Sequence, residues 1–216
     1  MEFPVKIPLT ICTFLMLAAL AGCAGVTAEV DARGALPDAG QRTVAYRFAP
    51  TPVQAEAGVN PPYETLLRDG LAKRGFVEGQ PKAAAYLVSA AWSTRPAEVT
   101  VATSDCKDAC AAPAGASFPW FGRPYVHTLT LRFFALPEGA EAYRVSVVKR
   151  DRDADAQAAL PYLVAGALAR LPYAGAPQWR VKLRAAGQTG GTAGDSAATT
   201  GAMPEVVSVK AVAPAQ

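Results

Sequence analysis

Histidine is almost absent from this chain of 216 residues, which contains only His127. A Ser-His-Asp or Cys-His catalytic arrangement would have to use it, and nothing in the sequence places Ser117 or Asp105 nearby. The Gly-x-Ser-x-Gly, P-loop, dinucleotide-binding and zinc-protease motifs are also missing. These absences predict a protein that is not an enzyme and that holds no cofactor.

The chain has neither a large net charge nor a long apolar run. The net charge is +3, and the Lys and Arg residues are scattered along the chain. This is too weak for a nucleic-acid footprint, so we expect no nucleic-acid partner. The mostly apolar run over residues 7–19 is shorter than the roughly 20 residues that a membrane-spanning helix needs, and it indicates a secretory signal peptide instead.

The strongest pattern that is present follows this run directly. Lys6 precedes it, and Leu20, Ala21, Gly22 and Cys23 come after it. These residues resemble the lipobox of bacterial lipoproteins, which implies cleavage before Cys23 and attachment of several acyl chains there. Two or more chains hold a protein stably, at about 0.8 kcal/mol per buried methylene. The alternatives are a chance cysteine in an ordinary secretory signal and a buried core helix.

The residue after the cysteine indicates a destination. Among lipoproteins, Asp at this position is the main signal for retention at the inner membrane, and this chain has Ala24. The resemblance therefore implies the periplasmic face of the outer membrane. We expect residues 1–22 to be the signal peptide, 23–42 the lipidated cysteine and a flexible tether, 43–184 one domain, and 185–216 a disordered tail. Residues 205–212 are an alternative short strand in that tail.

Two cysteines remain for the folded domain, because Cys12 would leave with the signal peptide and Cys23 would take lipid. Cys106 and Cys110 would pair in an oxidising periplasm. So small a ring constrains the unfolded chain by about 2 kcal/mol, and we interpret it as a loop disulfide. A redox pair and half a metal site are the alternatives. The redox motif usually has one residue fewer between its cysteines, and only His127 is available as a further histidine ligand, so we expect no metal.

Hydrophobic periodicity predicts the order β-α-β-β-β-α. Strands are expected over residues 43–48, 84–93, 126–136 and 143–150, with a further short one at 179–183, and helices over about 61–75 and 156–171. Asn60 is the expected N-cap of the first helix, and its apolar face contains Tyr63, Leu66, Leu67, Gly70 and Leu71. This order implies an α+β fold with a mixed, mainly antiparallel sheet and two helices packed on one face.

His127 lies in the third of these strands. Alternation places it on one face with Leu129, Leu131 and Phe133, and places Thr128, Thr130 and Arg132 on the other. We therefore expect a half-buried strand histidine and not a catalytic one. Residues 151–155 begin like a calcium-binding loop, but Ala156 occupies the position that requires glycine, so we predict a solvated turn.

A loop broken by Pro and Gly contains Phe118, Trp120, Phe121, Arg123 and Tyr125. Two interpretations remain open. The aromatic side chains pack over the sheet as a satellite of the core, or they form a site for a partner or the membrane interface, with Arg123 as its cation.

Three short motifs carry a family resemblance. They are the helix end at residues 71–76, the strand at 84–88 and the closing Leu171-Pro172. They resemble the bacterial lipoproteins grouped as domain of unknown function 4136, with departures at Arg74, Ala85 and Leu171. The resemblance spans residues 43–173 and implies a fold and a lipoprotein location. Because the activity of that family is not established, it implies no functional residue.

We therefore expect a lipid-anchored envelope lipoprotein that is a non-catalytic binding or structural module. Its partner would be an envelope protein or a glycan, bound through one sheet face or the aromatic loop. The alternatives are an envelope thiol-redox factor that uses Cys106, Cys110 and His127, and a small-ligand carrier with a pocket between sheet and helices.

Overall fold

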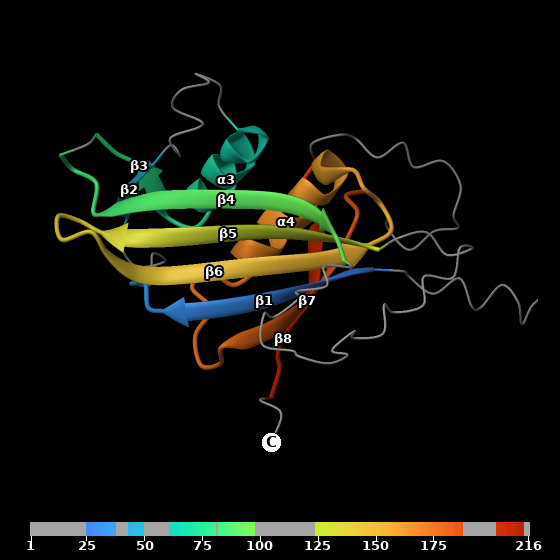
Figure 1. Cartoon of the computed structure of the whole chain (residues 1–216). Coiled ribbons are helices and arrows are strands. Elements are labelled where there is room, and N and C mark those ends of the chain that lie inside the picture. Colours follow the sequence, from blue (N-terminus) through green and yellow to red (C-terminus); the bar gives the residue numbers. More distant parts are fainter. Residues whose placement is uncertain are drawn as a thin grey trace, which may run out of the picture.

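A computed structural model describes residues 25–37, 43–49, 61–80, 82–97, 124–187 and 202–213. Within them the elements follow the order β1 (Val26–Gly34), β2 (Val44–Phe48), α3 (Pro62–Ala72), β3 (Phe76–Glu78), β4 (Tyr86–Pro96), β5 (Tyr125–Ala135), β6 (Ala140–Asp151), α4 (Ala156–Leu168), β7 (Gln178–Arg184) and β8 (Glu205–Ala211). The strands form one eight-stranded sheet in the spatial order β3-β2-β4-β5-β6-β1-β7-β8 (Figure 1).

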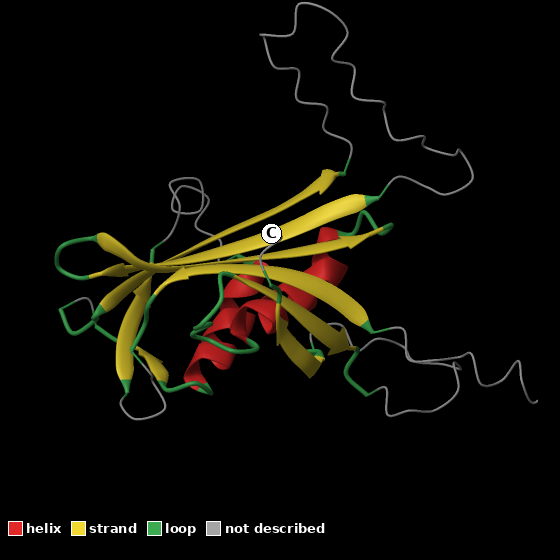
Figure 2. Ribbon diagram, turned by 90° about the horizontal axis from the view of Figure 1, so that it is seen from below, coloured by secondary structure: helices red, strands yellow, loops and turns green. Residues whose placement is uncertain are grey.

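Most neighbouring strands in the sheet are antiparallel. Among the described strands, only β2 makes parallel pairs, with β3 on one side and β4 on the other. Strands β5 and β6 form the predicted hairpin. Both helices lie on the same side of the sheet (Figure 2). The predicted α+β fold, with a mixed, mainly antiparallel sheet and two helices on one face, is therefore confirmed.

Helix α3 buries the face that the sequence predicts. Pro62 begins the helix, where the missing N–H has no helical partner in any case. Tyr63, Leu67, Gly70 and Leu71 are buried. A Cβ atom on Gly70 would lie 2.3 Å from Cδ1 of Leu168, so this glycine allows α3 and α4 to approach closely. The N-cap is Pro61, which makes no side-chain cap hydrogen bond, and not the predicted Asn60, which lies outside the described residues.

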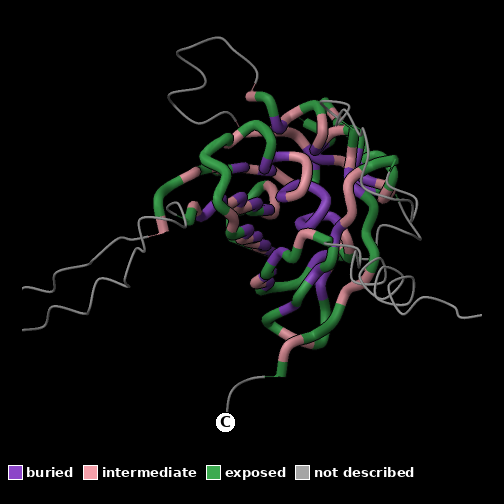
Figure 3. Tube along the Cα trace, turned by 90° about the vertical axis from the view of Figure 1, so that its right-hand side faces the viewer, coloured by how far each residue is buried: buried purple, intermediate pink, exposed green. Residues whose placement is uncertain are grey.

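Helix α4 is shorter than predicted. Its N-cap Asp155 accepts a hydrogen bond from the backbone N–H of Gln157, at 2.8 Å. The helix ends at Leu168 and not at Leu171, because a residue before proline is disfavoured in the helical conformation and Leu171 precedes Pro172. Buried residues from both helices and from the facing side of the strands form one hydrophobic core between the layers (Figure 3).

The expected tether over residues 23–42 is corrected by β1. This strand lies inside the sheet, paired with β6 on one side and β7 on the other. Its buried residues are Ala28, Val30 and Ala32. They alternate with polar residues, but two of the three are alanines, which are small and depleted in strands, so the two-residue period is easily missed in the sequence.

The expected disordered tail over residues 185–216 is also corrected in part. Residues 205–211 form β8, an edge strand antiparallel to β7, as the alternative short strand predicted. The three-residue edge strand β3, which pairs with β2, was not predicted, because so short a segment has no measurable alternation.

Replacing Val30 by Ala tests whether β1 belongs to the core. Val30 is 2% exposed, whereas Val207 in β8 is 45% exposed and serves as the matched control. We expect Val30→Ala to lower the free energy of unfolding by about 2 kcal/mol, since each buried methylene contributes about 0.8 kcal/mol and a cavity adds to the loss. Val207→Ala should change it by less than about 0.5 kcal/mol. Urea denaturation measures both, and equal small effects would contradict the placement of β1.

Candidate functional site

The sheet face opposite the helices carries polar side chains. No helix or strand of the described residues covers it (Figure 2). Strand alternation places on this face Thr27, Glu29, Asp31 and Arg33 of β1, Thr128, Thr130 and Arg132 of β5, Arg144, Ser146 and Arg150 of β6, and Gln178, Arg180 and Lys182 of β7. We call this surface the open face. Its side chains are mostly polar, whereas those on the face beneath the helices are apolar. The open face is therefore suited to contact with water or with a polar partner.

Several side chains on the open face are paired with one another. Arg150 donates to the carboxylate of Glu29, and Nε of Arg33 lies 3.2 Å from Oδ1 of Asp31. The hydroxyl oxygens of Thr130 and Ser146 are 3.0 Å apart. Exposed ion pairs contribute only about 0 to 1 kcal/mol to stability. Their main effect here is to hold polar groups in position on neighbouring strands.

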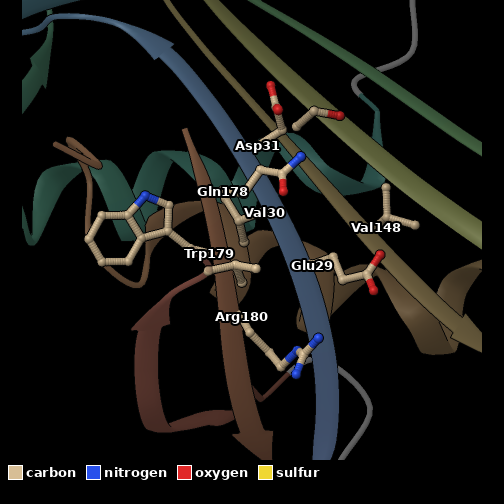
Figure 4. A pocket seen from close by; sticks show the side chains of 9 residues that line it. Glu29, Val30, Asp31, Val148, Gln178, Trp179 and Arg180 are labelled. Carbon is tan, nitrogen blue, oxygen red and sulfur yellow. The ribbon is translucent and has the colours of Figure 1, made fainter. Parts of the chain in front are cut away.

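A hollow of about 340 Å³ lies on the open face where β6, β1 and β7 run side by side. This volume is at the lower end of the range for small-ligand sites, roughly 300 to 1,000 Å³. Residues that line the hollow are Glu29, Val30, Asp31, Ser146, Val148, Gln178, Trp179, Arg180 and Val212 (Figure 4). The hollow therefore combines two carboxylates with an amide, a guanidinium and a hydroxyl.

The register of the strands brings these groups together. Asp31 lies directly opposite Ser146 on β6 and Gln178 on β7. Glu29 lies opposite Arg180. The hollow thus has hydrogen-bond acceptors along its centre on β1 and donors along its β7 side, which fits a ligand rich in hydroxyl or amide groups.

The β7 side of the hollow is cationic. Arg180 lies directly opposite Lys210 on β8, and Lys182 is two residues along the same strand. None of the three makes an ion pair with the described residues. Like charges directly opposite each other on neighbouring strands are unfavourable, so this side of the hollow is suited to electronegative groups of a partner.

His127 is fully buried, at 0% exposure, which places it on the predicted face but deeper than expected. Its Nε2 lies 3.1 Å from Oδ1 of Asp151 and 3.0 Å from the carbonyl oxygen of Asp153. Because both of these atoms are acceptors, Nε2 carries the proton. Nδ1, 2.9 Å from Oγ1 of Thr94, then accepts a hydrogen bond from that hydroxyl.

A buried lysine completes this cluster. Lys149 is 6% exposed and donates to Asp151, whose side chain is partly exposed. Register places Thr94, His127 and Lys149 in one row across β4, β5 and β6. Both ring nitrogens of His127 are hydrogen-bonded to neighbouring groups, and the ring has no exposed surface. These hydrogen bonds therefore fix the positions of the side chains in this row and of the turn into α4.

Burial controls the protonation of both basic groups. Burial lowers the pKa of His127, and the nearby Lys149 lowers it further, although the hydrogen bond to the Asp153 carbonyl and the charges of Asp153 and Asp155 oppose the shift. Burial also lowers the pKa of Lys149, against the attraction of Asp153. The imidazole is therefore held neutral near physiological pH.

Most of the residues that the sequence analysis selected lie outside the described part of the chain. These are Leu20, Ala21, Gly22, Cys23, Cys106, Cys110, Phe118, Trp120, Phe121 and Arg123. Tyr125 is the first residue of β5, where it is partly buried and lies opposite Asp151. The structure instead brings together four residues of the hollow that the sequence analysis did not select: Glu29, Asp31, Gln178 and Arg180. The alternation of polar and apolar residues in β1 was the one pattern in the sequence that could have indicated them.

The described residues contain neither a membrane-spanning helix nor a metal-binding cluster. No helix among them has the length and apolar character needed to cross a bilayer. Their His, Cys, Asp and Glu side chains form no group of three or more that is arranged to hold a metal ion.

The buried imidazole predicts a pH dependence of stability. Because the pKa of His127 is lowered in the folded state, the unfolded chain binds this proton more readily, and stability falls as the pH decreases through the unfolded-state value of about 6.5. We expect the free energy of unfolding to decrease between pH 7.5 and 5.5. His127→Gln should flatten this slope, whatever its effect on stability at pH 7.5. An unchanged slope in the variant, measured by urea denaturation, would assign the pH dependence to other groups.

No protein-family profile matches the sequence, and no curated protein does. Among solved structures, the chain is similar to a PelC dodecamer from Paraburkholderia phytofirmans, at 16% identity over 65% of this chain and 95% of that chain, with a TM-score of 0.37. It is also similar to a PDZ domain protein from Parabacteroides distasonis, at 12% identity over 74% of this chain and 40% of that chain, with a TM-score of 0.44. With TM-scores below 0.5, these likenesses assign no function to the chain.

Proposed function

We propose that this chain is a lipid-anchored lipoprotein at the periplasmic face of the outer membrane, where it acts as a non-catalytic binding module. The observation that carries the binding role is the open face, which has a hollow over β6, β1 and β7 where charged and polar groups lie among apolar ones. The lipobox at residues 20–23 supports the anchor. The resemblance to the lipoproteins of domain of unknown function 4136 supports the location.

The chemistry of the hollow supports a polar envelope partner, a glycan or a protein segment. Carboxylates of Glu29 and Asp31 accept hydrogen bonds from hydroxyl or amide groups, and Gln178 and Arg180 donate to oxygen atoms. The histidine that catalysis would need is buried and fully hydrogen-bonded on the other side of the sheet. The groups at the hollow are therefore suited to binding by hydrogen bonds and charge.

The lipid anchor can be tested in cells. We expect globomycin, which inhibits the lipoprotein signal peptidase, to cause accumulation of an unprocessed form. Cys23→Ala should abolish labelling by radioactive palmitate and release the protein from the membrane fraction. Cys106→Ala is the matched control and should leave labelling and fractionation unchanged. A protein of normal size in the membrane fraction under both treatments would contradict the anchor.

The binding role can be tested by crosslinking in intact cells. A photoreactive amino acid at Lys182, on the open face, should form crosslinks to a partner, whereas the same group at the exposed Lys73 after α3 should not. Arg180→Ala should weaken the Lys182 crosslink several-fold or more, because interface arginines often contribute about 2 kcal/mol. Melting should change little, since Arg180 is exposed. Equal crosslinking from both positions would contradict a role for the open face.

A further inference from the structure

We infer that the domain is held directly against the membrane, and that one end of the sheet faces the lipid headgroups. This inference rests on the proposed lipidation of Cys23. It goes beyond that proposal because it assigns the domain an orientation and a membrane-contacting surface. Two observations carry it, namely where β1 begins and how it is paired.

The covalent distance from the anchor to the sheet is very short. Gly25 is described and lies against β7, where a Cβ atom on it would be 3.1 Å from the carbonyl oxygen of Leu183. Cys23 is two residues earlier. Because an extended chain spans at most about 3.6 Å per residue, the Cα atoms of Cys23 and Gly25 are within about 7 Å of each other. A flexible segment of about 19 residues would instead have a root-mean-square length of about 24 Å.

The beginning of β1 cannot move away from the sheet to lengthen this connection. Val26 pairs with Leu183 of β7, and Ala28 pairs with both Val181 of β7 and Lys149 of β6. Ala28 has no exposed surface. Releasing these residues would break two hydrogen-bonded ladders and open the core, so the strand holds the anchor close to the folded domain.

Strand directions show which end of the sheet is near the anchor. Because β1 is antiparallel to β6 and β7, it begins where those strands end. The same end contains the last residue of β4, Pro96, and the first residue of β5, Tyr125, which lie opposite each other. In Figure 1 this is the right-hand end of β4, β5, β6 and β1. We call it the proximal end.

Arginines and carboxylates are mixed at the proximal end. Arg95, Arg150 and Arg184 lie within the last few residues of β4, β6 and β7. Arg150 and Arg184 have carboxylate partners, Glu29 and Glu205, and Arg95 makes no ion pair with the described residues. Asp151 lies opposite Tyr125 at this end, and Asp153 and Asp155 follow in the exposed turn into α4, so the orientation rests on the covalent anchor and not on charge.

The opposite, distal end then projects away from the membrane. Strand β6 has 12 residues, so at about 3.3 Å per residue the β5–β6 turn with Glu138 stands almost 40 Å from the proximal end. Asp31 is five residues after Val26, which places the hollow about 17 Å from that end. The open face would thus stand upright and turn its hollow sideways, toward partners in the periplasm beside the membrane.

Fluorescence quenching in proteoliposomes tests the orientation. The full-length lipoprotein, isolated from membranes, would carry Cys106→Ser and Cys110→Ser so that one introduced cysteine takes the fluorophore. The labelled positions are Arg95→Cys at the proximal end and Glu138→Cys at the distal end, both exposed. Vesicles contain phosphatidylethanolamine, phosphatidylglycerol and a lipid with a nitroxide on its headgroup. We expect quenching at position 95 to exceed that at position 138 several-fold.

An insertion supplies the matched control. Ten Gly and Ser residues placed between Cys23 and Ala24 add a root-mean-square length of about 17 Å, and should reduce quenching at position 95 toward the value at position 138. Equal quenching at both positions in the protein without the insertion, together with sedimentation on vesicles, would overturn the orientation alone. Protein that does not sediment with vesicles would overturn the lipid anchor and the orientation with it.

Discussion

The position of β1 between β6 and β7 is the constraint on which the rest of the structure depends. Without it the β7–β8 pair would have no connection to the other strands of the sheet. Its apolar side packs beneath α4, where Gly166 leaves room: a Cβ atom there would lie 2.9 Å from Val147 and 3.6 Å from Ala28. Small residues on β1 thus allow the helix to lie close to the sheet, and close packing excludes voids that would cost stability.

The two sides of the sheet differ in the surroundings of their polar groups. On the helix side, the row of Thr94, His127 and Lys149 is hydrogen-bonded internally, whereas the buried hydroxyl of Tyr46 and the indole N–H of Trp92 have no hydrogen-bond partner among the described residues. Most buried polar groups in folded proteins are hydrogen-bonded, and the row follows that rule. On the open face the polar groups are in contact with water, some of them paired with one another, and several converge at the hollow that Asp31 and Arg180 line.

The proposed anchor and the proposed binding face are linked through the same strand. Glu29 and Asp31 supply the carboxylates of the hollow, and residues 23–25 would connect β1 to lipid. A partner bound at the open face would therefore be held at a set distance from the membrane, with little freedom for the domain to tumble.

The chain also leaves the sheet at Ala97 and returns to it at Pro124 at the proximal end, since the Ala97 N–H donates a hydrogen bond to the Pro124 carbonyl at 2.8 Å.

Local patterns were sufficient for some features and insufficient for others. The lipobox is a contiguous motif, and the β5–β6 hairpin and the α3 face depend on large apolar residues at regular spacing, so the sequence alone predicts them. The strand β1 has mostly alanines on its buried side, and its pairing is decided by contacts with residues more than 110 positions away, such as Lys149 and Val181. The hollow joins β6, β1 and β7, whose order in space differs from their order in the chain. Only the tertiary structure decides where the hollow forms, because the register of the strands brings Asp31, Ser146 and Gln178 together although they are far apart in the sequence.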